Sequence, residues 1–234
     1  MKKCVLIVAG GSGMRMGADI PKQFLPLAGV PVLIHTLRRF FLWENRLPVG
    51  LVLPEDQFSF WEKLAAEFLT PSQRAQITLS KGGKTRTESV HNGLEKLTAR
   101  VGESEDALVG IHDGVRPFVT NDMLTTAFEL AAVHGASVVC VPVKASIREI
   151  GDDGQSRAVD RARFLEVQTP QTFKLKEILD CYRNRAAEGN FTDDASLYEL
   201  TGKTVAICPG SYDNIKITTP EDLLVAEGIL RGSQ

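Results

Sequence analysis

Apolar and polar positions follow two patterns along this chain, continuous apolar runs and amphipathic stretches, and the two patterns alternate. Short apolar runs of the kind that form buried strands occupy residues 3–8, 49–53, 76–79, 107–112 and 137–141. Amphipathic stretches with helical spacing occupy residues 32–43, 57–68, 88–97, 122–134, 175–188 and 221–231. Strands that alternate with helices are typical of βαβ units, so we predict an α/β fold built on a mostly parallel, doubly wound sheet.

The segment 144–164 breaks this pattern because it is polar and alternates only weakly. The sequence Gly151-Asp152-Asp153-Gly154 at its centre is typical of a four-residue turn and predicts a β-hairpin. An isolated two-stranded ribbon is marginally stable in water. We therefore expect the hairpin to project from the domain and to be stabilised by a second subunit. The alternative is a hairpin that folds onto its own domain.

The length and charge of the chain limit the number of domains and the kinds of partner that we expect. The 234 residues are enough for one large α/β domain or two small ones. A net charge of −2 produces no overall field that would attract nucleic acid or an anionic membrane. No apolar run reaches roughly 18 residues and the N-terminus lacks a signal-peptide core, so we expect a cytoplasmic protein that contacts no membrane. Four scattered cysteines predict buried, reduced thiols, and four histidines show no metal-ligand spacing.

The segment VAGGSGMRMG, from Val8 to Gly17, directly follows the first apolar run. Its glycines allow the backbone to pass close to phosphate oxygens and to point several N–H groups at them. Arg15 in this segment and Lys22 seven residues later supply the positive charge that a triphosphate requires. The pattern predicts a phosphate-binding loop at the carboxyl end of the first strand. The alternative is a glycine-rich turn without a ligand.

Two better-known phosphate motifs do not fit the chain. A Walker loop ends in Gly-Lys-Ser/Thr, and the Gly-Lys-Thr that begins at Gly202 has Leu197 where the motif requires a glycine. The dinucleotide fingerprint can start at Gly11, but it then meets Met16 in place of its last glycine, and the region about 20 residues further on is apolar instead of acidic. These failures argue against a dinucleotide-dependent oxidoreductase.

Polar residues also follow other predicted strands, at the end where doubly wound sheets bind ligands. Gly82-Gly83 lies ahead of a helix, so its backbone can approach a flat base that Ser89 can hydrogen-bond, although helix capping is the alternative. Asp113 follows an apolar run and is placed for a divalent ion or a substrate hydroxyl. Arg116 either pairs with Asp113 or binds a second phosphate.

Lys216 lies between Ile215 and Ile217 on a short predicted strand near the C-terminus. An inward-facing lysine between isoleucines requires an anion, and a phosphate is a good candidate. The alternative is a lysine on the solvent face of that strand. Thr219 and Pro220 then form a typical helix start, with threonine as the N-cap and proline at the first helical position.

Taken in order, these motifs resemble the family of 2-C-methyl-D-erythritol 4-phosphate cytidylyltransferases, and the resemblance extends from Lys3 to about Ile229. It includes the glycine-rich loop with Arg15 and Lys22, and Asp-Asn-Ile-Lys at 213–216. The other motifs that carry it are Gly-Gly-x-x-Arg-x-x-Ser-Val at 82–90, His-Asp-x-x-Arg-Pro at 112–117, Val-Asp-Arg at 159–161, Thr-Pro-Gln at 169–171 and Thr-Asp-Asp-Ala-Ser at 192–196.

The resemblance implies a single Rossmann-like nucleotidyltransferase domain over residues 1–234, with residues 143–165 as a β-arm exchanged across a homodimer. It also implies an enzyme of non-mevalonate isoprenoid precursor biosynthesis that joins CTP to 2-C-methyl-D-erythritol 4-phosphate. The products would be the CDP-alcohol and pyrophosphate. The acceptor phosphate would attack the α-phosphorus of CTP in line, with Mg²⁺ as the divalent cation.

The resemblance further implies roles for individual residues. Arg15 and Lys22 would stabilise the transition state, while Arg161 and Lys216 would position the acceptor phosphate. The residues expected at the nucleotide are Ala9, Gly10, Gly11, Gly13, Gly83 and Ser89. The residues expected at the acceptor or the ribose are Asp113, Arg116, Ser146 and Thr169. The partner subunit would supply Arg161 and Ser146, with Arg116 expected from either subunit. Asp113 is the expected metal ligand; Asp213, or an ion held mostly by the triphosphate, is the alternative.

Two alternative functions remain at this point. A ribitol-5-phosphate cytidylyltransferase would use the same chemistry on another acceptor, although the motifs at 159–161 and 213–216 favour methylerythritol phosphate. A non-catalytic nucleotide-binding module would bind CTP without releasing pyrophosphate. The presence of Arg15, Lys22 and Asp113 argues against that second alternative.

Overall fold

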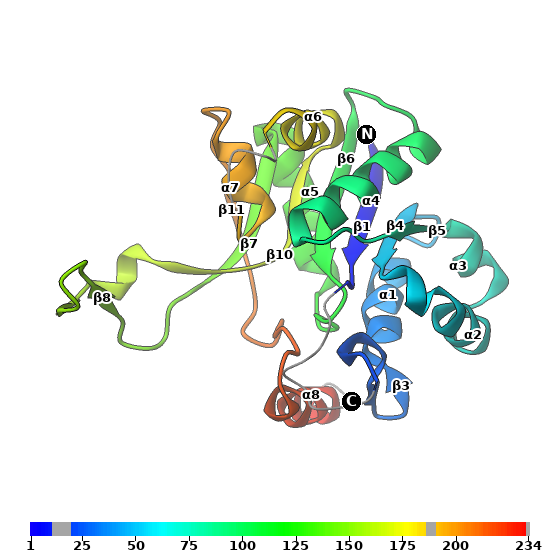
Figure 1. Cartoon of the computed structure of the whole chain (residues 1–234), viewed down its shortest axis with the longest axis horizontal. Helices are drawn as coiled ribbons and strands as arrows, with labels where there is room; N and C mark the ends of the chain where they lie inside the picture. The colour runs from blue at the N-terminus through cyan, green and yellow to red at the C-terminus, as the bar shows by residue number, and fades with distance from the viewer. Residues whose placement is uncertain (11–19, 186–190, 233–234) are drawn as a thin grey trace.

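The computed structural model describes residues 1–10, 20–185 and 191–232. Its centre is a seven-stranded sheet (Figure 1). The strands, in spatial order, are β11 (Ala206–Pro209), β7 (Ala136–Pro142), β10 (Leu165–Lys174), β6 (Ala107–Asp113), β1 (Lys2–Val8), β4 (Val49–Leu53) and β5 (Ile77–Lys81). Neighbouring strands are parallel except at β10, which runs antiparallel to β6 and to β7. The predicted mostly parallel α/β sheet is confirmed.

Helices cover both faces of this sheet. One face carries α1 (Val32–Trp43), α2 (Phe58–Phe68) and α5 (Asn121–His134). The other face carries α4 (Arg86–Val101), α6 (Leu175–Arg185) and α7 (Asp194–Glu199). Side chains alternate along a strand, so Leu6 and Ile7 of β1 enter opposite cores, and both are fully buried. This two-sided burial explains why β1 is a continuous apolar run.

The last helix, α8 (Pro220–Gly232), lies below the carboxyl ends of the strands (Figure 1). Its Ala226 packs in a small apolar cluster with Val115 and Ile217. Thr219 caps the helix as predicted, because its hydroxyl oxygen accepts a hydrogen bond from the Asp222 N–H at 3.3 Å. The remaining short elements are β2 (Pro26–Leu27), β3 (Val30–Pro31), α3 (Pro71–Gln76) and the 3-10 turns η2 (Lys22–Phe24) and η3 (Glu55–Gln57).

Most predicted elements agree with the structure to within a few residues, and β4 and α1 coincide with their predicted ranges. Strand β10 was not predicted, because Pro170 and several polar residues interrupt its apolar pattern. It tolerates them because its register shifts between Val167 and Gln171, and prolines within sheets occur at such bulges. The short strand β11 was also missed. Helix α6 ends at Arg185, and the rest of the predicted helix 175–188 extends into residues outside the described part.

The strand predicted around Lys216 is wrong. Residues 211–219 are irregular and belong to no sheet. A backbone hydrogen bond from the Ile217 N–H to the Val115 carbonyl, 3.0 Å, attaches this segment to the loop after β6. The position of Lys216 therefore depends on side-chain contacts and not on a strand ladder.

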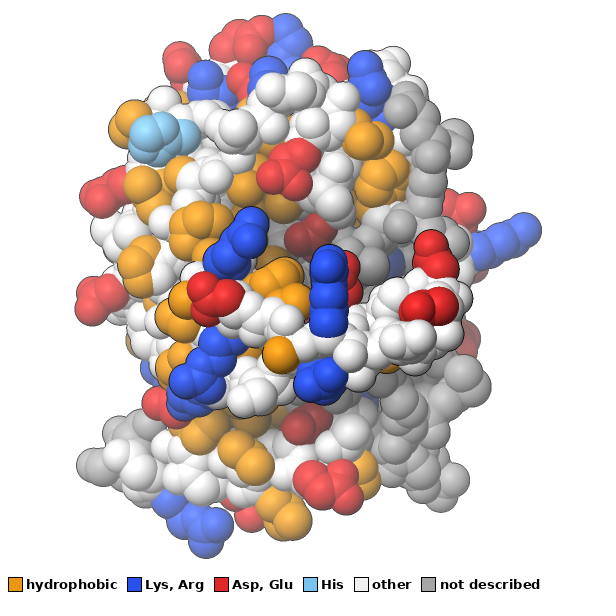
Figure 2. Space-filling model, turned by 90° about the vertical axis from the view of Figure 1, so that its left-hand side faces the viewer, with side chains coloured by type: hydrophobic (Ala, Val, Ile, Leu, Met, Phe, Trp, Pro, Cys, Tyr) orange, Lys and Arg blue, Asp and Glu red, His pale blue; other side chains and the backbone are white. Residues whose placement is uncertain are grey.

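The polar segment forms the predicted hairpin. Strands β8 (Arg148–Ile150) and β9 (Ser156–Ala158) are antiparallel and are followed by the 3-10 turn η4 (Arg161–Arg163). Residues 143–165, which we call the arm, project from the body of the molecule (Figure 1). Figure 2 looks onto the arm and shows charged side chains along it, with hydrophobic atoms on the face behind. Two apolar side chains of the arm, Ile150 and Phe164, are 74% and 45% exposed.

The four cysteines are unpaired and buried, as predicted. Burial raises the pKa of the Cys4 thiol to about 12, which keeps this thiol protonated and unreactive. Across the described ranges, no helix combines the length and apolar character that a membrane span requires.

Candidate active site

A cleft of about 390 Å³ opens at the carboxyl ends of β1 and β6. β4 and β5 lie on one side of β1, and β6 lies on the other, so the chain changes direction at this point of the sheet. Ligands of doubly wound sheets bind at such a point. The described residues that line the cleft are Val8, Ala9, Gly10, Lys22, Gln23, Gly83, Lys84, Thr85, Arg86, Ser89, Asp113, Val115 and Lys216.

The register of β1 against β6 places the ends of these two strands together. Val8 lies opposite Asp113, and the Gly114 N–H donates a 2.9 Å hydrogen bond to the Val8 carbonyl. Ala9 and Gly10 continue from β1 into the cleft. A side chain at Gly10 would start 3.9 Å from the Ser89 hydroxyl oxygen, so the end of β1 approaches the start of α4. The structure thus brings together residues about 80 and 100 positions apart, as parallel strands do.

The start of α4 forms one wall of the cleft. Thr85 caps the helix by accepting the Glu88 N–H at 3.1 Å. The Ser89 hydroxyl donates to the Thr85 carbonyl at 2.8 Å and accepts the Gly83 N–H at 2.9 Å. A side chain at Gly83 would lie only 2.3 Å from the Glu88 Cβ, which explains the glycine. Because the Ser89 hydroxyl hydrogen is already donated, Ser89 can act towards a ligand only as an acceptor.

Lys22 reaches the cleft from the 3-10 turn η2. The neighbouring Gln23 is fully buried and donates from Nε2 to Gln57 Oε1 at 2.7 Å, which ties this turn to η3 beyond β4. Phe24 adds a backbone hydrogen bond to the Pro21 carbonyl at 2.8 Å. These contacts hold the backbone that carries Lys22 in place at the rim of the cleft.

Asp113 is the carboxylate of the cleft that two cationic side chains contact. Its Oδ2 lies 3.1 Å from the Arg116 Nε and 3.1 Å from the Lys216 Nζ. Burial by itself raises the pKa of this carboxyl group, but the attraction of Lys216, Arg116 and Arg86 outweighs burial and lowers the pKa to about 2. Asp113 is therefore an anion at neutral pH. Of the two interpretations of Arg116, the structure has the pair with Asp113, within the same chain.

His112 and Thr169 form the layer behind Asp113. The Thr169 hydroxyl oxygen accepts the Asp113 N–H at 3.1 Å and lies 3.0 Å from His112 Nδ1. His112 Nε2 lies 3.1 Å from the Arg116 carbonyl, an acceptor, so Nε2 carries the proton and Thr169 donates to Nδ1. Burial lowers the pKa of His112 to about 4, so the imidazole is neutral near pH 7.

Arg86 was not assigned a role from the sequence, although it stands in the glycine motif at 82–90. It makes a bidentate pair with Asp194, at 2.8 and 2.7 Å, and Asp194 is fully buried. The Tyr182 hydroxyl donates to the same carboxylate at 2.5 Å. The pair joins the α4 wall of the cleft to the N-terminus of α7, 108 residues away. Burial lowers the pKa of Arg86, but the charge of Asp194 outweighs burial and raises it.

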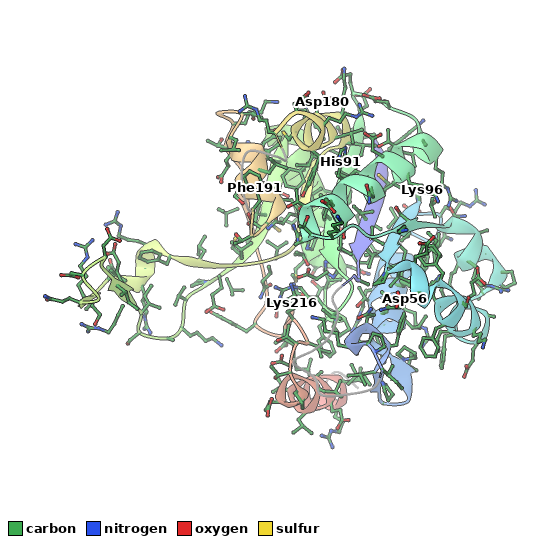
Figure 3. The ribbon with its side chains drawn as sticks, in the orientation of Figure 1. Asp56, His91, Lys96, Asp180, Phe191 and Lys216 are labelled. Carbon is green, nitrogen blue, oxygen red and sulfur yellow. The ribbon has the colours of Figure 1, made fainter. Side chains whose placement is uncertain are left out.

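The remaining predicted residues fall into three groups. Gly11, Gly13 and Arg15 lie outside the described part of the chain. Thr169 is buried behind Asp113, so its contact with a substrate stays a prediction. Ser146 and Arg161 are exposed and belong to the arm, which projects from the body of the molecule (Figure 1). Lys216, in contrast, lies between the strand ends and α8 (Figure 3).

The described residues offer little to a metal ion by themselves. They contain no group of three or more His, Cys, Asp and Glu side chains that could hold a metal. Asp113 is the one carboxylate among the described lining residues of the cleft. Mg²⁺ prefers octahedral oxygen coordination and usually keeps water and substrate phosphates as ligands. Asp113 therefore fits as one ligand of an ion that the phosphates bring with them.

Known proteins match this chain over nearly its whole length. The family model for 2-C-methyl-D-erythritol 4-phosphate cytidylyltransferase matches residues 3–232. Proteins of that name from Bacteroides thetaiotaomicron and Porphyromonas gingivalis are 43% and 45% identical over 230 and 231 residues, covering 98% of this chain and 100% and 98% of theirs.

Solved structures give the same result. A 4-diphosphocytidyl-2C-methyl-D-erythritol synthase from Anaerococcus prevotii superimposes with a TM-score of 0.83 at 29% identity, covering 98% of this chain and 96% of that one. The 2-C-methyl-D-erythritol 4-phosphate cytidylyltransferase from Thermus thermophilus gives a TM-score of 0.75 at 30% identity, with 99% and 100% coverage. The chain therefore belongs to the 2-C-methyl-D-erythritol 4-phosphate cytidylyltransferase family.

Proposed function

We propose that this chain transfers the cytidylyl group of CTP to 2-C-methyl-D-erythritol 4-phosphate and releases pyrophosphate. The observation that carries the proposal is the charge of the cleft. Besides Arg86, which is paired with Asp194, its described lining contains Lys22, Lys84 and Lys216, but Asp113 as its single carboxylate. A triphosphate and a phosphate monoester together bring several negative charges, and this lining suits both at once. Relatives named for this reaction match nearly the whole chain.

The reaction needs electrostatic help more than it needs a base. An oxygen of the acceptor phosphate forms a bond to the α-phosphorus while the bond from that phosphorus to the pyrophosphate oxygen breaks. The attacking group is a phosphate dianion, so no proton has to be removed from it. His112 supports this view, because both of its ring nitrogens are engaged within the protein. The task left to the protein is to bring two anions together and to stabilise the charge of the transition state.

Two cations act on the transferred phosphorus in this proposal. Lys22 at the rim of the cleft and Arg15, from the loop outside the described residues, bind the phosphates and stabilise the transition state. Lys216 positions the acceptor phosphate. Its ammonium group lies 3.1 Å from Asp113 Oδ2, and an ammonium has further N–H groups for a phosphate oxygen. Asp113 thus holds the lysine where the acceptor enters.

The nucleotide is expected along Ala9, Gly10, Gly83 and Ser89. Ser89 offers its ligand a lone pair, since its hydrogen is donated to the Thr85 carbonyl. Cytosine presents an amino group, a donor, where uracil presents an acceptor oxygen. This polarity supports a preference for CTP over UTP, because a mismatch would leave two acceptors facing each other. Ser89→Ala should reduce that preference.

A bound Mg²⁺ ion would neutralise phosphate oxygens and make the α-phosphorus more electrophilic. Asp113 would supply one carboxylate oxygen to it, and phosphate oxygens and water would supply the others. We also propose that the reaction takes place in the cytoplasm, where CTP is available.

The proposal includes a homodimer in which the arms are exchanged. The arm has little support from its own chain, and a two-stranded ribbon alone is marginally stable. Its exposed Ile150, Phe164 and Leu165 suit contact with another protein surface. In this arrangement, Arg161 and Ser146 reach the acceptor in the partner's cleft. The Arg161 guanidinium also donates to the Lys144 carbonyl, which links the two sides of the arm.

The experiment that tests the proposal is pyrophosphate release from CTP and Mg²⁺ with two acceptors in parallel. We expect release with 2-C-methyl-D-erythritol 4-phosphate. Release with ribitol 5-phosphate alone would overturn the acceptor assignment and leave the reaction type intact. Binding of CTP without release with either acceptor would instead identify a non-catalytic nucleotide-binding module.

A further inference from the structure

Asn214 is fully buried in the irregular segment that carries Lys216. Its side-chain Nδ2 donates to the Thr169 carbonyl at 3.0 Å and to Gln168 Oε1 at 3.1 Å. Both acceptors lie in the bulge of β10. The side chain therefore connects the Lys216 segment to the central sheet, in a place where the backbone forms no strand ladder.

The main chain of Asn214 makes a second connection. Its carbonyl oxygen accepts a 2.8 Å hydrogen bond from Arg116 Nη1. The same guanidinium donates from Nε to Asp113 Oδ2 at 3.1 Å. Arg116 thus connects Asp113 to the main chain of Asn214. Lys216, two residues further along the chain, also contacts Asp113, with its Nζ 3.1 Å from Oδ2.

The chemistry of the contacts requires an amide at position 214. Both partners of Nδ2 are acceptors, so a flipped amide or a carboxylate would set oxygen against oxygen. Within the described part of the chain, Asn214 Oδ1 is buried and has no hydrogen-bond partner. An unpaired buried acceptor is unfavourable, so the favourable contribution of this side chain comes from the two hydrogen bonds that its NH₂ group donates.

We propose that Asn214 is a positioning residue for the transfer reaction: it holds the Lys216 ammonium beside Asp113, where the acceptor phosphate is bound. The inference rests on the proposed function, in which Lys216 binds that phosphate. Asn214 itself is fully buried and does not line the cleft, so it acts through Lys216. Misplacement of a binding group by about 1 Å can reduce the rate by about 10²-fold, so a buried contact this close to the cleft matters.

A double-mutant cycle on kcat/KM for the acceptor separates positioning from general structural support. Asn214→Ala should lower kcat/KM by roughly 10- to 100-fold, mostly through acceptor KM. In a Lys216→Ala background, the same change should cost less than about twofold, because the group that Asn214 positions is gone. Asn214→Asp, which has the shape of asparagine without its donors, should behave like Asn214→Ala. Equal losses in the two backgrounds would overturn the inference.

Ser137→Ala is the matched control. The Ser137 hydroxyl is fully buried and donates to the Ala127 carbonyl at 2.6 Å, far along the sheet from the cleft. This variant loses a comparable buried hydrogen bond and should keep the kcat/KM of the wild type. If Asn214→Ala does not fold, Asn214→Ser and Gln168→Ala, which each remove part of the contacts, enter the same cycle with the same criterion.

A crystal structure of Asn214→Ala provides a readout that needs no activity. We expect the Lys216 ammonium to have left Asp113 Oδ2. If the two atoms remain in contact as in the wild type, the inference fails even where the enzyme is active. An inactive wild-type enzyme would overturn the proposed function alone, and the position of Lys216 in the variant would still decide the role of Asn214.

Discussion

The cleft and the arm are built in opposite ways. Around the cleft, Asp113, His112 and Asn214 are buried, and each is held by contacts to other segments of the chain. On the arm, β8 and β9 pair with each other, and the side chains from Arg148 to Ser156 are exposed. The cleft is therefore organised before any ligand arrives, whereas the arm carries charged groups on a ribbon with little support from its own chain. This difference is consistent with the proposed dimer, in which one chain completes the cleft of another.

The largest effect is expected at the buried ion pair that stiffens the cleft wall. Arg86→Ala leaves the fully buried Asp194 without its cation, and such a change costs about 3–5 kcal/mol of the free energy of unfolding. Chemical denaturation measures it. Lys81→Ala, which breaks an exposed pair with Glu55, is the control and should cost less than about 1 kcal/mol. Similar losses of unfolding free energy in both variants would show that the buried Arg86–Asp194 pair stabilises the protein no more than an exposed pair does.

Removal of the rim lysine should affect catalysis instead of stability. Lys22→Ala should lower turnover about 10²–10³-fold, by analogy with the loss of one preorganised donor to a transition state. Steady-state pyrophosphate release measures this effect. Lys96→Ala, an exposed lysine on α4 in Figure 3, should leave turnover unchanged. Near-normal turnover in Lys22→Ala would remove Lys22 from the mechanism.

The neutral His112 predicts how stability depends on pH. Its pKa is about 4 in the folded protein, against the ordinary value of 6.5 for a solvent-exposed histidine, so the unfolded chain binds more protons between these two pH values. The unfolding free energy should therefore fall as pH drops from about 6.5 to about 4, by about 3 kcal/mol from this residue. Glutamine does not titrate, so the unfolding free energy of His112→Gln should depend less steeply on pH. Chemical denaturation at several pH values measures this slope. An unchanged slope would contradict the neutral, buried state of His112.

On the arm, the prediction is a specific loss of acceptor binding without a loss of stability. Arg161→Ala should raise the KM for the acceptor roughly ten- to hundredfold, the effect of losing a hydrogen bond to a charged group. Arg157→Ala is the matched control on the same ribbon, where Arg157 pairs with Glu149 in solvent. A change in CTP affinity alone would contradict the placement of Arg161 at the acceptor.

The sequence predicted the part of the site that depends on strand ends. Apolar runs identified β1 and β6, and the carboxyl ends of parallel strands meet at one edge, so the convergence of Gly10 and Asp113 followed from pattern alone. Lys216 was also expected near an anion. The anion in the structure is the Asp113 carboxylate, 3.1 Å away, while the phosphate stays a prediction and the strand expected to carry Lys216 is absent. Local patterns and chemistry were sufficient for these residues.

The parts that the sequence did not predict depend on contacts between distant segments. Nothing in the local pattern pairs Arg86 with Asp194 or turns the side chain of Asn214 towards Thr169. Strand β10 was missed because Pro170 argues against a strand, and the bulge that accommodates it is a tertiary feature. The assignment of Arg161 to the partner's cleft came from the family resemblance instead of the local pattern, and it stays a prediction.

The claim that two chains build each site is tested most directly by heterodimers of two defective variants. With the acceptor well below its KM, where both defects lower the rate, dimers purified with one Lys22→Ala chain and one Arg161→Ala chain should regain about half of wild-type activity. A symmetric dimer with exchanged arms then has one site with both groups intact. A dimer of Lys22→Ala with Lys216→Ala, both cleft defects, should stay inactive. If the first heterodimer also stays inactive, each arm serves its own chain, and the account of the site is wrong.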